Sequence, residues 1–488
     1  MTHSPSGGPA WTEDSWRSKI LQRELVIQVE SVARLADDLQ DNADFATDTP
    51  SILCKLIGCT ASLIAKYLPQ TPPHKLRDVN ELCNTLSAHL RYAERSVIGL
   101  TPWSMIQPAE IFMTARAGAN CRFIIRPKWG FNYAIFGEFV GNYHAMIKNL
   151  EWIPTKEWLD EIDDTINLEI YAVSFPRIGR LNCLYHVNWG HEVGHILARR
   201  WLKSNFPPLW REKQTKIAKA LTEHVKANPP PVTSDILDDF IKQTVFDSLK
   251  TTMSLFRHGL EELLCDAVAV HLFGPAALAA ACEFSARYYP DINPLGQSEY
   301  PPWRYRLRHM LDACENDLER CEEALDGDKK SLADRLTPYV TWLRDTNRFV
   351  ESDDDQQAVD RHILTKLAYD LIETVWADAR DDVLRSLPED VSAPYQLCDR
   401  LDTIEELVGK LDANIPPNEV GSWPETQPSL FEDILNAGWA FKMKVATSGE
   451  DWGKSDDHAR LYRLLLKSLE ASFVHEHFNA KSPEKQRQ

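Results

Sequence analysis

The feature that most constrains this chain is the pentapeptide His191-Glu192-Val193-Gly194-His195, with the apolar sequence on both sides of it. Apolar residues recur at helical spacing from Leu184 before the pentapeptide to Trp201 after it, and a stop signal follows near Asn205 and Pro207. Residues four apart lie on one face of an α-helix, about one turn from each other. The sequence therefore predicts a helix that presents two imidazoles on one face and Glu192 at its flank.

Two imidazoles at this spacing can bind one Zn²⁺. Glu192 would then lie beside a coordination position left for water, where a carboxylate can act as general base. The alternative is a surface helix with two unrelated histidines, since so short a motif also arises by chance in a chain with 15 histidines. Gly194 lowers helix propensity by about 1 kcal/mol relative to alanine, which favours the close approach of another backbone.

A catalytic zinc site needs a third protein ligand. A third histidine six residues after the second is excluded, because Trp201 stands there. Glu262 and Asp266 are four apart in a later apolar segment, so we expect Glu262 to bind the metal and Asp266 to accept a hydrogen bond from a ligand histidine. Glu261 is the competing ligand, although it would place Cys265 rather than an acid one turn further on. An exposed acidic face is the simpler alternative for these carboxylates.

HEVGH followed by ExxxD on a later helix resembles the gluzincin metallopeptidases. The segment EELLCDAVAVHLFGPAAL is similar to the second zinc helix of soluble relatives of the CAAX-prenyl-protease-like peptidases, and the resemblance covers roughly residues 170–310. It implies a zincin-like core with His191, His195 and Glu262 on the metal, Glu192 as the base, and a protein or peptide as substrate.

The similar families often continue with a His-Pro-containing turn and an arginine. This chain has SEYPPWRYRLRHM instead, with Tyr300 where the histidine would be and Arg306 at the arginine position. The group that would stabilise the transition state is therefore open. The candidates, each of which also has an ordinary structural explanation, are Tyr300, Arg306, His258 and His309.

The remaining sequence predicts a mainly α (α+β) fold with one small sheet. Helical spacing marks the N-terminal part, for example from Leu25 through Leu35 to Leu39. Between residues 106 and 176, β-branched and aromatic residues predict two short strands around a possible turn at Gly130 and Asn132, and LEIYAVSFP predicts a third. The expected regions are a helical 1–105, a metallopeptidase core 106–310 with a Pro-interrupted insertion at 203–243, and a helical 311–488.

Composition limits the partners that we expect. A net charge of -18 disfavours nucleic acid. No signal-peptide pattern and no apolar run of about 18 residues stand out, so we expect a cytoplasmic protein without a membrane partner. Scattered cysteines without a CxxC pair argue against a thiolate zinc site.

The leading functional expectation is a zinc peptidase acting on an intracellular protein or peptide, with a regulatory protein partner left open. The alternative is a non-catalytic helical interaction protein in which zinc joins two helices, and a third is a helical scaffold without metal. Glu192 favours the first, because metal binding does not require it and water activation does.

Overall fold

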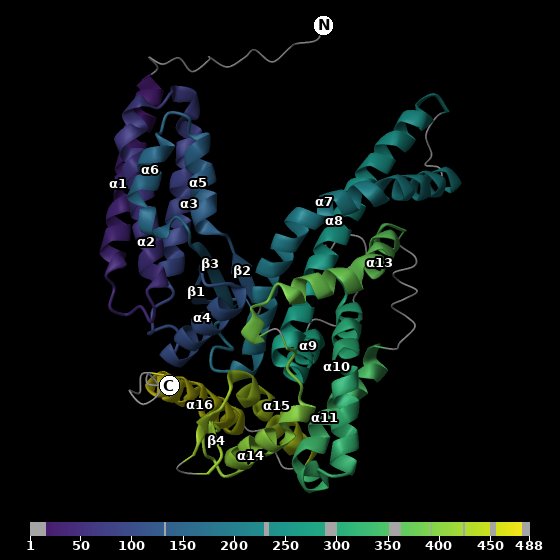
Figure 1. Ribbon diagram of the computed structural model, residues 1–488. Coiled ribbons are helices and arrows are strands. Elements are labelled where there is room, and N and C mark those ends of the chain that lie inside the picture. The colour runs from purple at the N-terminus through teal and green to yellow at the C-terminus, as the bar shows by residue number, and fades with distance from the viewer. Residues whose placement is uncertain are drawn as a thin grey trace. The chain divides into compact units, whose positions relative to one another are not determined.

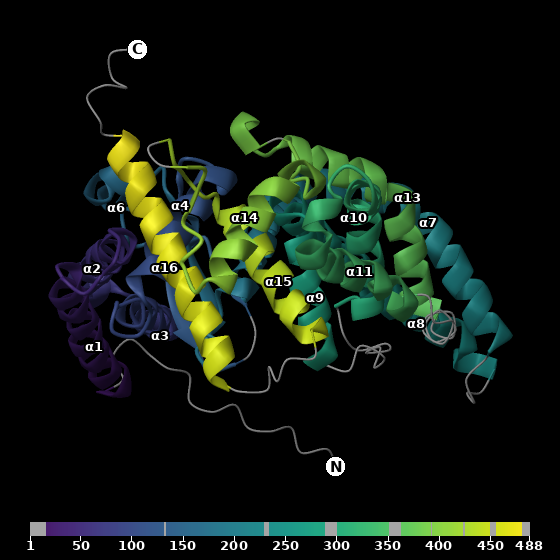
Figure 2. The ribbon, with the colours of Figure 1, turned by 90° about the horizontal axis from the view of Figure 1, so that it is seen from below.

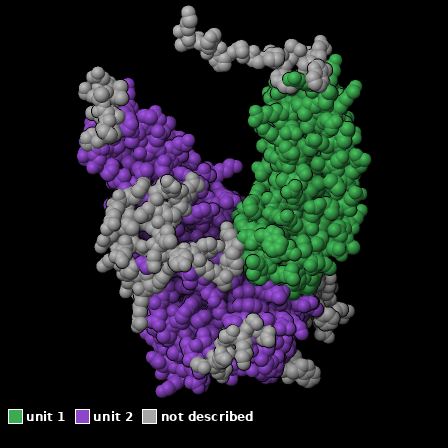
Figure 3. All heavy atoms as spheres, turned by 180° about the vertical axis from the view of Figure 1, so that it is seen from behind, with its two compact units in different colours: residues 1–180 green, residues 181–488 purple. Residues whose placement is uncertain are grey.

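The computed structural model describes residues 16–130, 133–228, 234–287, 300–350, 363–391, 393–422, 425–448 and 455–480. The chain is 77% helix with a small sheet, which confirms the mainly helical prediction. It forms two compact units, residues 1–180 and 181–488 (Figures 1 and 3). This division differs from the three expected regions, whose boundaries at 105/106 and 310/311 fall inside the helices α4 (Trp103–Ala117) and α10 (Trp303–Asp326).

Unit 1 begins with helices α1 (Trp16–Gln40), α2 (Thr49–Tyr67) and α3 (Leu76–Glu94), which pack against one another. Leu25 and Val29 of α1 are fully buried between them, as their spacing predicts. Leu35 is 52% exposed, so the buried stripe of α1 is narrower than its apolar residues suggested.

The segment Thr49–Gln70, which is α2 and the short 3-10 helix after it, is long and apolar enough to cross a membrane. Lys55 and Lys66 interrupt its apolar run, so the sequence does not predict a membrane helix there. Of its most apolar window, 56% is buried. The core helix of a protein can have the same length and apolar composition as a membrane helix. The expectation of no membrane partner therefore stays a prediction.

The sheet of unit 1 contains the three predicted strands, β1 (Cys121–Lys128), β2 (Ala134–Phe136) and β3 (Glu169–Pro176). β3 lies in the middle, parallel to β1 and antiparallel to β2. β1 and β2 therefore do not pair as a hairpin, and Asn132 of the expected turn lies outside the described residues. Along the chain, α4 precedes β1, and the helices α5 (Phe139–Asn149) and α6 (Thr155–Glu161) lie between β2 and β3.

Unit 2 is built on two helices of 40 residues each, α7 (Asn188–Ala227) and α8 (Ser234–Phe273), which pack along each other (Figure 1). The predicted end of α7 near Asn205 and Pro207 is wrong, because the helix continues through both prolines to Ala227. Phe206 is buried and its ring lies 5.2 Å from that of Phe256 on α8, and such packing can override a local helix-breaking signal. Most of the expected insertion is thus helix, and its residues 229–233 lie outside the described residues.

The other helices of unit 2 pack on this pair and on one another. α8 ends where predicted, at Gly274 with φ +56°. α10 and α13 (Ile363–Arg385) contact α8, and Figure 2 shows α16 (Ser455–Ala480) running beside α15 (Phe431–Thr447). The remaining elements are α9 (Pro275–Arg287), α11 (Ala333–Val350), α14 (Leu401–Asp412) and the strand pair β4 (Glu419–Val420) and β5 (Gln427–Pro428).

Candidate metal centre

Two glycines let α7 and α8 approach closely at the HExxH pentapeptide. A Cβ atom added at Gly194 would lie 2.5 Å from the Cα atom of Cys265, and one added at Gly190 would lie 3.1 Å from the Cα atom of Ala269. Real Cβ atoms are essentially never found at the first distance. The close backbone approach predicted from Gly194 is therefore confirmed, and it brings the side chains of the two helices within reach of each other.

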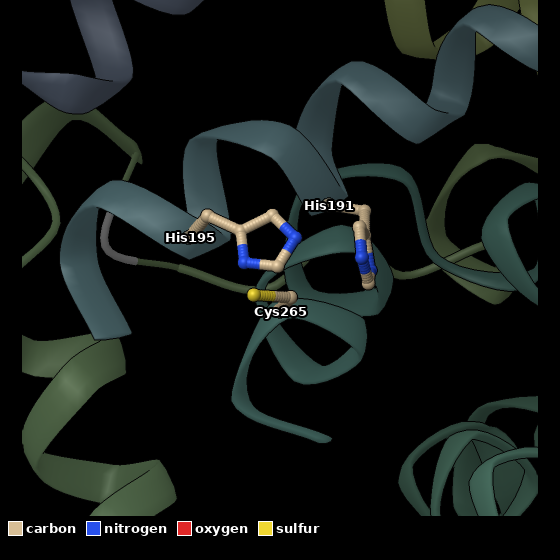
Figure 4. Close-up of side chains that lie close together, drawn as sticks. All are labelled: His191, His195 and Cys265. Carbon is tan, nitrogen blue, oxygen red and sulfur yellow. The ribbon is translucent and has the colours of Figure 1, made fainter. Parts of the chain in front are cut away.

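The approach brings His191 and His195 of α7 together with Glu262 of α8. The Nε2 atom of His191 lies 3.5 Å from Oε2 of Glu262, and Nε2 of His195 lies 3.8 Å from Oε1 of the same carboxylate. The two rings are nearly perpendicular, with centroids 4.9 Å apart (Figure 4). Ligand atoms of a tetrahedral zinc are separated by about 3.4 Å, given bonds of about 2.1 Å. The two imidazole–carboxylate distances, each to a different oxygen of Glu262, are close to this separation.

Both imidazoles are oriented by a second carboxylate. Nδ1 of His191 lies 2.9 Å from Oδ1 of Asp266, as the sequence analysis expected of one ligand histidine. Nδ1 of His195 lies 2.9 Å from Oε1 of Glu261. When the Nδ1–H group donates a hydrogen bond to a carboxylate, the free lone pair of the imidazole is on Nε2. This is the tautomer that a metal ligand needs.

Glu261, weighed at first as a rival ligand, is thus the partner of His195. Its carboxylate also accepts a hydrogen bond of 2.7 Å from Nε of Arg199, one turn after His195 on α7. Sequence reasoning missed this role, although the doubled acid Glu261-Glu262 carried the signal: adjacent residues of a helix point about 100° apart and can serve two different groups.

Arg306 of α10 binds the carboxylates of Asp266 and Glu262. Its Nε and Nη2 atoms each donate a hydrogen bond of 2.7 Å to Asp266, and Nη1 lies 3.2 Å from Oε2 of Glu262. Burial by itself would raise the pKa of both carboxyls, but the Arg306 charge and His191 hold the pKa of Glu262 and of Asp266 below the ordinary value. Arg306 therefore keeps the two carboxylates ionised and in place.

The charges of the cluster suit a divalent cation. The cluster contains four buried carboxylates (Glu192, Glu261, Glu262 and Asp266) and the guanidinium groups of Arg199 and Arg306. This excess of negative charge acts on His191: burial opposes its charged form, yet Asp266 and Glu262 raise its pKa to about 10. A site that attracts a proton so strongly also attracts a metal cation.

Cys265 is a second candidate for the third ligand, and sequence reasoning missed it. One ligand atom each of His191, His195 and Cys265 lie within 4.8 Å of one another, and the thiol lies beneath the two rings (Figure 4). Burial, together with Glu262 and the other nearby acids, raises the thiol pKa well above its ordinary value, whereas a metal binds the thiolate. Glu262 differs from this thiol in being ionised already and in lying 3.5 and 3.8 Å from the two Nε2 atoms.

Glu192 lies among these groups and is 2% exposed. Its negative charge is one of those that raise the pKa values of Arg199, Cys265 and Tyr300, so its carboxylate lies within electrostatic range of all three. The predicted base therefore belongs to the same cluster as the predicted ligands.

Of the candidate transition-state donors, Tyr300 is exposed and lies within electrostatic range of the predicted ligand Glu262. It is 62% exposed, and its pKa is raised by partial burial and then by Glu262. Arg306 is occupied by two carboxylates, as described above. His258 contacts Ser254 of its own helix, with Nδ1 3.0 Å from the backbone oxygen, and His309 lies 3.2 Å from Glu373.

Comparisons with protein-family models, with curated proteins and with solved structures found no match to this chain. The resemblance to gluzincin peptidases therefore stays a prediction from the quoted motifs, and the case for a metal centre rests on the geometry of α7, α8 and α10.

Proposed function

We propose that this chain is a zinc-dependent peptidase in which His191, His195 and Glu262 hold the metal and Glu192 is the general base. The observation that carries the proposal is the pair of Nε2 atoms facing one Glu262 carboxylate at 3.5 and 3.8 Å. A catalytic site of this type has three protein ligands and one position for water, and its acid beside the metal activates that water.

Each residue of the cluster has a definite task in this proposal. Zinc, when bound, would lower the pKa of a coordinated water and polarise the scissile carbonyl. Glu192 accepts the water proton and returns it to the leaving amine. Asp266 and Glu261 keep the two imidazoles in the metal-binding tautomer. Tyr300 donates a hydrogen bond to the oxygen on which negative charge develops.

The second candidate function is a structural zinc that joins α7 to α8. The observation that favours it is Cys265, because a fourth protein ligand would close the position that water needs. Glu192 separates the two functions. A structural site does not need this acid, whereas activation of a metal-bound water does.

The test compares wild-type protein with Glu192→Gln, which keeps the shape of the side chain and removes its basicity. Native mass spectrometry counts zinc, and a peptide library analysed by mass spectrometry reports cleavage. We expect about one zinc per chain in both proteins and cleavage by the wild type alone. Glu212→Gln is the control, because this acid lies on the same helix with its side chain 68% exposed.

Equal cleavage by the wild type and Glu192→Gln would remove Glu192 from the reaction. Zinc in both proteins with cleavage in neither would favour the structural site. Absence of zinc from both, after purification with added zinc, would reject the metal centre itself.

A further inference from the structure

The sheet of unit 1 holds a buried arginine that has no acidic partner in the described part of the chain. Arg126 of β1 is 9% exposed, and its Nε atom is buried with no hydrogen-bond partner among the described residues. Its contacts are with aromatic faces: the guanidinium carbon lies 3.8 Å from the ring centre of Tyr92 and 5.7 Å from that of Phe136. Burial lowers its pKa to about 10, so it still carries its charge at neutral pH.

A second unsatisfied donor lies beside Arg126. Ser174 of β3 is opposite Arg126 in the parallel register, so the two side chains leave the same face of the sheet. Ser174 is 0% exposed, and its Oγ atom has no hydrogen-bond partner within the described part of the chain. Two neighbouring buried donors without acceptors are unusual, because buried polar groups are nearly always hydrogen-bonded.

Aromatic rings pack against the guanidinium group of Arg126. Tyr92 covers its face, and Phe136, the second ring near it, is 36% exposed. Arg95, exposed at the end of α3, adds positive charge, since it is among the causes that lower the pKa of Arg126. In a chain with a net charge of -18, this is a local positive site.

We propose that Arg126 and Ser174 form a binding site for a small oxyanion, a phosphate or a carboxylate group. The guanidinium edge presents two parallel N–H donors, which match two oxygens of such a group, and the Ser174 hydroxyl donates a third hydrogen bond. Stacking on Tyr92 holds the guanidinium plane in position before the ligand arrives. This site is independent of the proposed metal centre in unit 2.

The experiment is isothermal titration calorimetry of the full chain with inorganic phosphate and, separately, with acetate, at constant ionic strength. Thermal melting in the same solutions is the second readout, since a ligand that binds only the folded state raises the melting temperature. We expect binding to the wild type that weakens at least about tenfold in Arg126→Gln, the loss of a charge-assisted bidentate contact. Arg77→Gln, an exposed arginine of α3 with its side chain 84% exposed, is the matched control and should bind as the wild type does.

Ser174→Ala keeps the test decisive if Arg126→Gln fails to fold. It removes one neutral donor, so affinity should fall about fivefold. Binding of phosphate alone or acetate alone identifies the source of the oxyanion. The proposal is overturned if neither anion binds at about 20 mM, well above the usual range of specific sites, or if Arg126→Gln and Ser174→Ala bind as tightly as the wild type.

Discussion

Gly194 of α7 and Cys265 of α8 are in backbone contact: a Cβ atom at position 194 would lie 2.5 Å from the Cα atom of Cys265. Gly194 directly precedes His195 on α7, and Cys265 follows Glu262 by three residues on α8. Because the helices touch here, side chains of ordinary length bring their ligand atoms within 3.5 to 3.8 Å of one another.

Gly194→Ala should therefore push the two helices apart. We expect a loss of about 1–3 kcal/mol in the free energy of unfolding, as for other overpacked sites, together with weaker zinc binding. Chemical denaturation and zinc titration measure the two effects. Gly99→Ala is the control, because no atom lies within 4 Å of a Cβ added there, and an equally mild effect of Gly194→Ala would contradict the close approach.

Substituting each of the two candidate third ligands in turn should show which of them binds zinc. Glu262→Gln removes an ionised oxygen that faces both Nε2 atoms, so we expect zinc affinity to fall by a factor of about 100 or more. Cys265→Ser should retain zinc, because the proposed third ligand is Glu262 and not the thiol. Competition with a fluorescent zinc chelator measures both variants. The reverse order of losses would make Cys265 the ligand.

Asp266→Asn tests the orientation of His191. The amide keeps the shape but weakens the hydrogen bond to Nδ1, and it exchanges an ionic contact with Arg306 for a weaker one. We expect zinc affinity or activity to fall about 10- to 100-fold, the usual effect of such a partner. Glu261→Gln should lower zinc affinity in the same way through His195. Unchanged zinc affinity in both variants would show that Asp266 and Glu261 do not orient the ligand histidines.

Tyr300→Phe should lower kcat by a factor of about 100 while the zinc content stays the same, if Tyr300 stabilises the developing oxyanion. Tyr305→Phe is the matched control, since the Tyr305 hydroxyl instead donates a 2.7 Å hydrogen bond to Glu373. Steady-state kinetics on a cleaved peptide measures both. An effect of Tyr300→Phe on KM alone would assign Tyr300 to substrate binding.

Acid should weaken unit 1 through His89. Burial lowers the pKa of His89 to about 4, and its Nδ1 lies 2.7 Å from the Tyr143 hydroxyl. Between pH 6.5 and 4 the unfolded chain binds a proton that the folded chain does not, so stability falls as pH falls through this window, by about 2 kcal/mol at pH 5. Hydrogen exchange of the α3 amides, corrected for intrinsic rates, measures the loss. His89→Gln should reduce it, and an identical pH dependence in the variant would exclude His89 as its source.

The sequence was most informative where a short pattern has one physical meaning. The spacing of His191 and His195 required one helical face, Gly194 indicated a close backbone, and β-branched and aromatic residues marked all three strands of unit 1. The sequence was misleading where contacts between residues far apart in the chain determine the local structure. The prolines at 207 and 208 signalled a helix end, yet packing such as that between Phe206 and Phe256 continues α7 through them.

The sequence by itself determined the helices, the two imidazoles on one face and the acids of the second helix, because these follow from the 3.6-residue period of the backbone. Only the tertiary structure decided which acid faces which histidine nitrogen, that Arg306 anchors Glu262 and Asp266, and that Arg126 is buried beside Ser174. These relationships join residues far apart in the chain, and local periodicity does not specify how separate elements meet.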